Sequence, residues 1–189
     1  PSTVSDLNQK IYGKIEEGRM RPINEEHPYV FVDGVYLKRS WGGEVQNVSV
    51  LVAVGVNQDG YREILGVAEG SREDKESWSN FLRYLKDRGL KGVRLIISDK
   101  RLGLYEIIGD FFPEAKWQRC VVHWYRNVFN LCPWKHVREV AAMLKAVHAQ
   151  EDKEAARAKA GLVVEKLRRM KLEKAAELVE KSVEETLSY

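Results

Sequence analysis

Three apolar, β-branched runs follow one another between residues 29 and 70, with only short polar stretches between them. They read YVFVDGVYL from residue 29, NVSVLVAVGVN from residue 47 and YREILGVAEG from residue 61. Such runs are typical of strands, and the QDG at residues 58–60 is a hairpin-turn sequence. Three strands joined this tightly predict an antiparallel meander.

A helix and a fourth strand are predicted next. From Ser71 the apolar residues recur at helical spacing on one face, and Gly89 ends the pattern; they are Trp78, Phe81, Leu82 and Leu85. The run GVRLIISD at residues 92–99 is continuously apolar, as in a strand buried on both faces. A right-handed crossover would place this strand parallel to the first.

The remaining elements complete an α/β pattern. We expect a helix over 103–112, a fifth strand over 117–123, a helix over 124–131 and helices from 137 to the end. This order predicts a ribonuclease-H-like mixed five-stranded sheet with flanking helices, followed by an all-α C-terminal region. The predicted domains are an N-terminal helix and linker over 1–28, the end of a DNA-binding region; a core over 29–136; and a helical region over 137–189.

Composition limits the function classes. No apolar stretch of about 18 residues or secretory leader is present, so we expect a cytoplasmic protein without a membrane partner. Cys120 and Cys132 are too few for a disulfide framework. Between Arg83 and Arg138 there are 12 basic against 5 acidic residues, and 19 against 23 elsewhere. This basic middle region indicates a polyanion partner, although solvated helix faces have similar compositions.

Two aspartates stand out because each adjoins an apolar strand. Asp33 is expected to follow the first strand and Asp99 the fourth. If these strands are parallel neighbours, their carboxylates meet at one edge of the sheet, where ligands of α/β proteins gather. Hard carboxylate oxygens suit Mg²⁺ or Mn²⁺, which promote phosphodiester chemistry. The alternative is structural: Asp33 opens a turn with Gly34, and Asp99 caps a helix.

Five blocks of sequence, in order, resemble a known family. They are VFVDGVYLK, VAVGVNQDGYREILG, WSNFLRYLKDRGL, LIISD and FFPEAKWQRCVVHWYRNV. Together they are similar to the catalytic domain of bacterial insertion-sequence transposases of the Mutator-like group, from about residue 1 to 189.

The resemblance implies a DDE transposase that cleaves and joins DNA strands with two metal ions, Mg²⁺ or Mn²⁺. It implies that Asp33 and Asp99 are the first two catalytic and metal-binding carboxylates. Cys120 and His123 match the family's C-x-x-H signature, and Arg126 and Asn127 its R-N pair. Expected partners are transposon-end and target DNA and further copies of the chain on DNA, at the bacterial nucleoid.

Two departures from the family pattern bear on activity. The family's third carboxylate is a glutamate beyond a helical insertion, and neither Glu184 nor Glu185 matches its motif. We therefore expect a truncated chain with two of the three ligands. Lys100 and Arg101 place positive charge beside Asp99, where they would hold a DNA phosphate or compete with the cation.

Other residues have weaker assignments. Predicted phosphate contacts are Lys100, Arg101, Arg119, His123 and Arg126, each of which is also compatible with a surface or capping role. A zinc site would need Cys132 and His136 beside the C-x-x-H pair, at unconvincing spacing. Aromatic residues such as Trp124 suit either base stacking or the core. Two other functions stay open: a catalytically incomplete DNA-binding or assembly module, and a ribonuclease-H-like nuclease.

Overall fold

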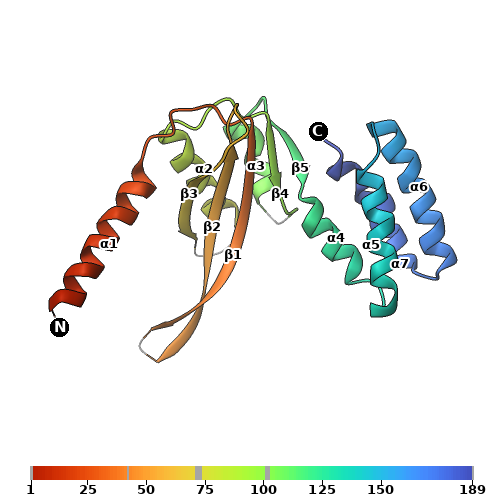
Figure 1. Ribbon diagram of the computed structural model, residues 1–189, viewed down its shortest axis with the longest axis horizontal. Coiled ribbons are helices and arrows are strands. Elements are labelled where there is room, and N and C mark those ends of the chain that lie inside the picture. The colour runs from red at the N-terminus through yellow and green to blue at the C-terminus, as the bar shows by residue number, and fades with distance from the viewer. Residues whose placement is uncertain (1, 42, 71–73, 101–102, 189) are drawn as a thin grey trace. The chain divides into compact units, whose positions relative to one another are not determined.

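The computed structural model describes residues 2–41, 43–70, 74–100 and 103–188 (Figure 1). The chain divides into two compact units. Unit 1 comprises residues 1–96 and 101–115, and unit 2 comprises residues 97–100 and 116–189.

Strands and helices follow the predicted order. The strands are β1 (Tyr29–Trp41), β2 (Glu44–Val56), β3 (Arg62–Gly70), β4 (Leu95–Ser98) and β5 (Lys116–Arg119). The helices are α1 (Ser2–Met20), α2 (Lys75–Asp87), α3 (Leu104–Phe111), α4 (Val121–Phe129), α5 (Trp134–His148), α6 (Lys153–Arg169), α7 (Glu173–Ser182) and the 3₁₀ helix η1 (Val183–Thr186).

The sheet has the order β3-β2-β1-β4-β5. β1, β2 and β3 form the predicted antiparallel meander. A parallel bridge joins Glu26 to Lys91, and the Leu95 backbone N–H donates to Pro28 O over 2.9 Å, so β4 starts beside β1. This mixed sheet with flanking helices confirms the α/β, ribonuclease-H-like prediction.

The first strand is longer than predicted. β1 continues through Asp33 to Trp41, and all its residues are paired with β2, from Tyr29 opposite Val56 to Trp41 opposite Glu44. β3 pairs with β2 only as far as Ser49, so the rest of the β1–β2 pair extends as a two-stranded ribbon (Figure 1). The expectation that Asp33 follows the first strand is therefore wrong, because Asp33 lies within β1, and so is the structural alternative of a turn at Asp33 and Gly34. The β-branched and aromatic run continues past Gly34, and the equally long β2 supplies its hydrogen bonds.

Helix α2 supplies much of the apolar core of unit 1. Its four predicted inward residues are all buried: Trp78, Phe81, Leu82 and Leu85. The Asp74 side chain caps the helix by accepting a hydrogen bond from Ser77 N over 2.9 Å. Gly89 follows the helix with a φ of 105°, a conformation that strongly favours glycine. The predicted amphipathic helix is confirmed from Lys75 onward, whereas its expected start at Ser71 lies outside the described residues.

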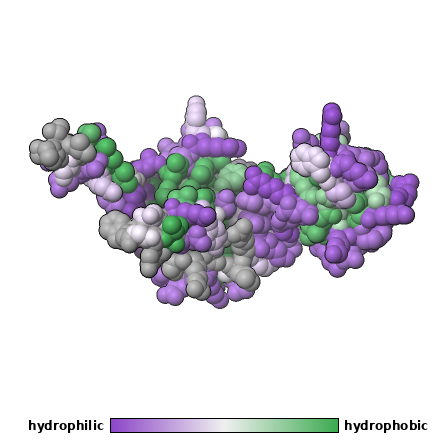
Figure 2. Space-filling model, turned by 90° about the horizontal axis from the view of Figure 1, so that it is seen from below, coloured by the Kyte–Doolittle hydropathy of each residue, from purple (hydrophilic) through white to green (hydrophobic). Residues whose placement is uncertain are grey.

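Helix α1 is also present, at the predicted N-terminal position. The side chains of Leu7, Ile11 and Ile15 are roughly half exposed, and Figure 2 shows apolar surface along this helix. In the described part of the chain, no helix is long and apolar enough to cross a membrane.

Unit 2 has its own core, formed between helices α4 to α7 and η1. Trp124, Val140, Leu144, Leu167 and Val179 are fully buried there. Trp124 is therefore a core residue, which is one of its two predicted roles. The Trp124 backbone N–H donates to Cys120 O over 2.9 Å, so α4 begins at Val121 rather than at residue 124, with Trp124 and Val128 on its buried face. The predicted strand over 117–123 is correspondingly wrong at its end, because β5 stops at Arg119.

Candidate functional site

Asp33 lies on the exposed face of β1. Side chains alternate along a strand, so Val30 and Val32 point inward and are almost fully buried, whereas Tyr29, Phe31 and Asp33 share the outer face. The Asp33 carboxylate accepts a hydrogen bond from Gly34 N over 3.0 Å. This position removes the energetic cost of an ionised carboxylate inside an apolar run and leaves the carboxylate open to solvent.

Asp99 comes directly after β4, as predicted, and belongs to unit 2. Only 15% of its side chain is exposed, and its Oδ1 accepts a hydrogen bond from Lys100 N over 2.8 Å. Ser98 steadies the strand end, because its hydroxyl donates to Asp99 O and accepts from Trp117 Nε1 over 2.9 Å. The carboxylate is therefore held close to the sheet on a short, ordered segment.

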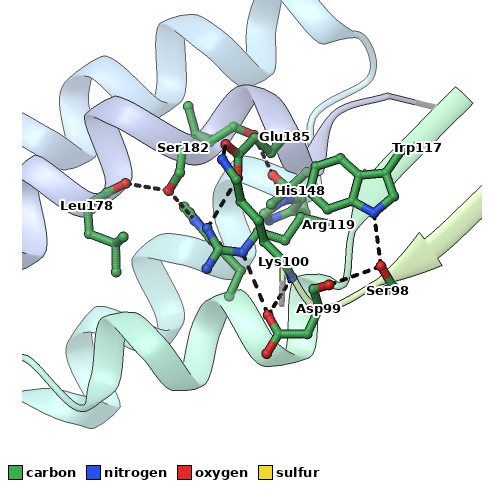
Figure 3. A network of polar contacts seen from close by, with 12 residues as sticks. Ser98, Asp99, Lys100, Trp117, Arg119, His148, Leu178, Ser182 and Glu185 are labelled. Atoms are coloured by element: carbon green, nitrogen blue, oxygen red, sulfur yellow. Dashed lines mark hydrogen bonds and ion pairs between the residues drawn. The ribbon is translucent and has the colours of Figure 1, made fainter. Parts of the chain in front are cut away.

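A buried arginine lies between two acidic groups in unit 2. Arg119 is the last residue of β5, and 10% of its side chain is exposed. Its Nε lies 4.0 Å from Asp99 Oδ1, and its Nη1 donates to Glu185 Oε2 over 3.2 Å (Figure 3). The guanidinium thus links the end of β4 to η1.

Lys100 completes this polar cluster. Its Nζ donates to the other Glu185 oxygen, Oε1, over 2.5 Å (Figure 3). Two basic and two acidic side chains therefore alternate in the order Lys100, Glu185, Arg119, Asp99. We refer to these four residues as the Asp99 cluster.

Sequence reasoning missed Glu185, because Glu184 and Glu185 look equivalent in a charged helical tail. The signal available was the apolar spacing around them: Val183 and Leu187 are both buried, so this segment packs on the bundle. Glu184 makes different contacts, with Arg157 over 2.5 Å and Lys153 over 3.9 Å. The hydrogen bond from Arg157 is the main cause of the lowered pKa of Glu184.

The C-x-x-H residues lie at a strand-to-helix junction. Cys120 is the N-cap residue of α4 and His123 is in its first turn, so the expectation that both lie in a strand is wrong. The His123 Nδ1 is buried and has no hydrogen-bond partner among the described residues. Arg126, one turn further on, is exposed, and Asn127 is half-buried.

The remaining predictions concern Arg101 and a possible zinc site. Arg101 lies outside the described residues. Burial raises the pKa of the Cys132 thiol, which disfavours the thiolate that zinc requires. Within the described ranges, no three His, Cys, Asp or Glu side chains are grouped closely enough to hold a metal ion.

The donor chemistry of Asp33 and Asp99 nevertheless suits a hard divalent cation. Carboxylate oxygens are the ligands that Mg²⁺ and Mn²⁺ prefer, and such ions are often held by one or two carboxylates together with substrate phosphates. Asp33 is exposed, whereas Asp99 has Arg119 near one oxygen. These two residues are the ones that would hold such an ion, with Arg119 as a competing positive charge.

Sequence comparison identifies relatives of the whole chain. The family described as "Transposase, Mutator family" matches residues 1–189. The chain is 35% identical over 188 residues to the transposase for insertion sequence element ISRM5 of Rhizobium meliloti, covering 100% of this chain and 47% of that protein. It is 34% identical over 190 residues to the transposase for insertion sequence element IS256 in transposon Tn4001 of Staphylococcus aureus, covering 100% and 49%.

A third relative is the transposase for insertion sequence element IS1081 of Mycobacterium tuberculosis. It is 39% identical over 155 residues, which cover 81% of this chain and 37% of that protein. The chain thus spans about half the length, or less, of these curated relatives.

Structural comparison gives distant likenesses. The HTLV-2 integrase catalytic core domain in complex with magnesium is 14% identical with a TM-score of 0.30, covering 74% of this chain and 85% of that one. A chain of the simian T-cell lymphotropic virus intasome in complex with PP2A regulatory subunit B56 gamma is 11% identical with a TM-score of 0.32, covering 71% and 57%.

Proposed function

Because this chain belongs to the Mutator family of transposases, we propose that it forms part of the catalytic domain of a DNA transposase, with Asp33 and Asp99 as two metal-binding carboxylates. The observation that carries the proposal is the family match over the whole chain. The position of Asp33 on β1 and of Asp99 directly after the neighbouring β4 supports the choice of residues.

The proposed reaction is cleavage of a DNA strand at the transposon end, followed by attack of the freed 3′ hydroxyl on target DNA. A Mg²⁺ or Mn²⁺ ion bound at these carboxylates would activate the attacking oxygen and stabilise the leaving oxygen. The chain's own residues would bind and orient the DNA backbone. Lys100 and Arg119 supply positive charge beside Asp99, and exposed Arg126 supplies a further phosphate contact.

His123 is proposed to act on the same substrate. Its buried Nδ1 has no partner within the described part of the chain, so it is available to bond a group that arrives with DNA. The basic region between residues 83 and 138 supports DNA as the partner. Assembly of several copies on transposon ends, at the nucleoid, is part of the same proposal.

Calorimetric titration with Mn²⁺ tests the metal assignment. The unchanged chain should bind Mn²⁺, and Asp33→Ala and Asp99→Ala should each weaken that binding by at least about tenfold, since each removes a carboxylate ligand. Asp110→Ala is the matched control, because Asp110 is an exposed aspartate on α3. Binding that is unchanged in both site variants would contradict the assignment.

One observation favours a second function, a metal-free DNA-binding or assembly module. Arg119 lies beside the Asp99 carboxylate, and its positive charge can take the place of a cation there. In that case the chain would bind DNA in the presence of EDTA and would show no carboxylate-dependent Mn²⁺ binding. The same titration therefore separates the two functions.

A further inference from the structure

We propose that the Glu185 carboxylate is an internal substitute for a DNA phosphate, occupying the anion site formed by Lys100 and Arg119 and restraining DNA binding there. This inference rests on the proposed function, because it assumes that the ligand of the basic pair is a phosphodiester. It adds to that function a way in which η1 of the helical region controls access of DNA to Lys100 and Arg119.

The contacts describe an anion site that is already formed. Lys100 Nζ and Arg119 Nη1 approach different oxygens of one carboxylate, over 2.5 Å and 3.2 Å (Figure 3). Two cationic groups thus donate to the two oxygens of one anion. This arrangement suits a phosphate as well as a carboxylate, because the N–H donors of arginine match the oxygens of both. The ligand class is therefore an oxyanion with at least two free oxygens.

Burial explains why this site needs an anion at all times. Arg119 is almost fully buried, and its Nε makes no hydrogen bond to any described residue although Asp99 lies 4.0 Å away. A buried guanidinium that loses a partner is costly unless another anion replaces it. Glu185 meets that need without DNA, and a phosphodiester would meet it with DNA bound.

The Glu185 side chain can leave without unfolding its segment. Its neighbours in and beside η1 are anchored independently, by the buried Val183 and Leu187 and by a 2.9 Å hydrogen bond between Thr186 Oγ1 and His148 Nε2. The Glu185 side chain itself is 22% exposed, and that of its partner Lys100 is 48% exposed. Exchange of carboxylate for phosphate thus begins with rotation of the Glu185 and Lys100 side chains, the more exposed members of the site, while Arg119 stays in place.

The adjacent glutamate provides a matched control. Glu184 lies in the same 3₁₀ helix but contacts Arg157 and Lys153 instead of the basic pair. Glu184→Gln and Glu185→Gln remove the same charge one residue apart. A general electrostatic effect would strengthen DNA binding in both variants. Freeing Lys100 and Arg119 to bind a phosphate would strengthen it only in Glu185→Gln.

The experiment is a fluorescence-anisotropy titration of labelled duplex DNA of arbitrary sequence, in EDTA, at several salt concentrations. Glu185→Gln should bind about three- to tenfold more tightly than Glu184→Gln. The plot of log affinity against log salt concentration should be steeper by about 1, because the site formed by Lys100 and Arg119 takes up one further DNA phosphate. Equal affinity and equal slope in the two variants would overturn the inference.

A second variant tests the same site in the opposite direction. Lys100→Ala added to Glu185→Gln should abolish most of the gain, and a gain that persists would place the effect elsewhere. Circular dichroism of each variant verifies that the helical region is folded. Because EDTA removes metal from this titration, a missing gain overturns this inference alone, whereas loss of carboxylate-dependent Mn²⁺ binding overturns the metal assignment alone. Absence of DNA binding by all variants overturns both this inference and the DNA-binding part of the proposed function.

Discussion

Arg119 at the end of β5 and Glu185 in η1 form an ion pair across 66 positions of sequence. The same guanidinium faces Asp99 at the end of β4. A single buried side chain therefore joins the proposed metal carboxylate to the last helical segment of unit 2. Sequence position alone predicts Arg119 as a surface phosphate contact, and its burial gives it a structural role as well.

Replacing Arg119 should destabilise the chain. Arg119→Met leaves Glu185 with Lys100 alone and removes the charge beside Asp99, and we expect a loss of about 1 to 3 kcal/mol in the free energy of unfolding. Urea denaturation followed by circular dichroism measures the change. Arg126→Met is the control, because Arg126 is exposed, and it should change the stability by less than about 0.5 kcal/mol. Equal effects of the two substitutions would contradict the role of Arg119.

The stability of unit 2 should fall in mild acid because of His148. Burial lowers the pKa of this histidine, which contacts Tyr125 Oη over 3.0 Å and Thr186 Oγ1 over 2.9 Å. Above the unfolded value of about 6.5, the side chain is neutral in both states and the full stability is present. As the pH falls below about 6.5, the unfolded chain takes up the proton first, so the free energy of unfolding decreases until the lower folded pKa is reached.

Urea midpoints measured between about pH 8 and about pH 5 test this dependence. His148→Gln should remove most of it, at some cost in stability at high pH. The lowered pKa of Glu184 has a separate effect, since its ordinary value is 4.5 and its contribution is lost only at more acidic pH. If His148→Gln keeps the full pH dependence of stability, another titrating group is responsible for it.

Trp124 should be the most sensitive core position of unit 2. The indole is fully buried, and its Nε1 donates to Ser182 Oγ over 2.8 Å, joining α4 to α7. Trp124→Ala should cost about 3 to 5 kcal/mol through the cavity that it leaves, and Trp124→Phe about 1 to 2 kcal/mol through lost volume and the lost bond. Denaturation measures both changes. If instead both variants keep the original free energy of unfolding but bind DNA poorly, Trp124 would be a base-stacking residue.

Local patterns predicted most of the fold. The face formed by Trp78, Phe81, Leu82 and Leu85 was predicted correctly because helix period and burial agree there. The continuously apolar run before Asp99 likewise indicated β4. These features depend on neighbouring residues, which the sequence shows directly.

The errors occur where distant contacts decide the outcome. The apolar run before Asp33 predicts that this residue follows the first strand, yet pairing with the 13-residue β2 carries β1 onward. The run at residues 117–123 predicts a strand that includes Cys120, but Trp124 and Val128 are buried on one face of a helix that begins at Val121. Tertiary packing overrides local propensity in both cases.

The Asp99 cluster is the part that sequence reasoning could predict least. The position of Lys100 beside Asp99 is visible in the sequence, but its partner Glu185 lies 85 residues away. This pairing depends on how the helices of unit 2 pack together and bring η1 next to Lys100. The local spacing of residues in the sequence does not predict that packing. The assignment of Asp33 and Asp99 as metal ligands stays a prediction.

Two glycines of unit 1 should respond oppositely to substitution by alanine. A Cβ at Gly55 in β2 would lie 2.5 Å from His27 Cδ2 and 2.7 Å from Leu65 Cδ1, and His27 is fully buried and held 2.6 Å from Glu63 Oε1. Gly55→Ala should therefore lower the free energy of unfolding by about 1 to 3 kcal/mol, because neither neighbour can move freely.

Gly109 is the matched control for that substitution. It lies inside α3, and a Cβ there would meet no described atom within 4 Å apart from its chain neighbours and the backbone of its own helix. Gly109→Ala should raise the free energy of unfolding by about 0.5 to 1 kcal/mol, because alanine loses less backbone freedom than glycine in a helix. Urea denaturation of both variants gives the comparison. Tolerance of Gly55→Ala would show that the packing around His27 is looser than these distances imply, and destabilisation by Gly109→Ala would contradict the open surroundings of that helix position.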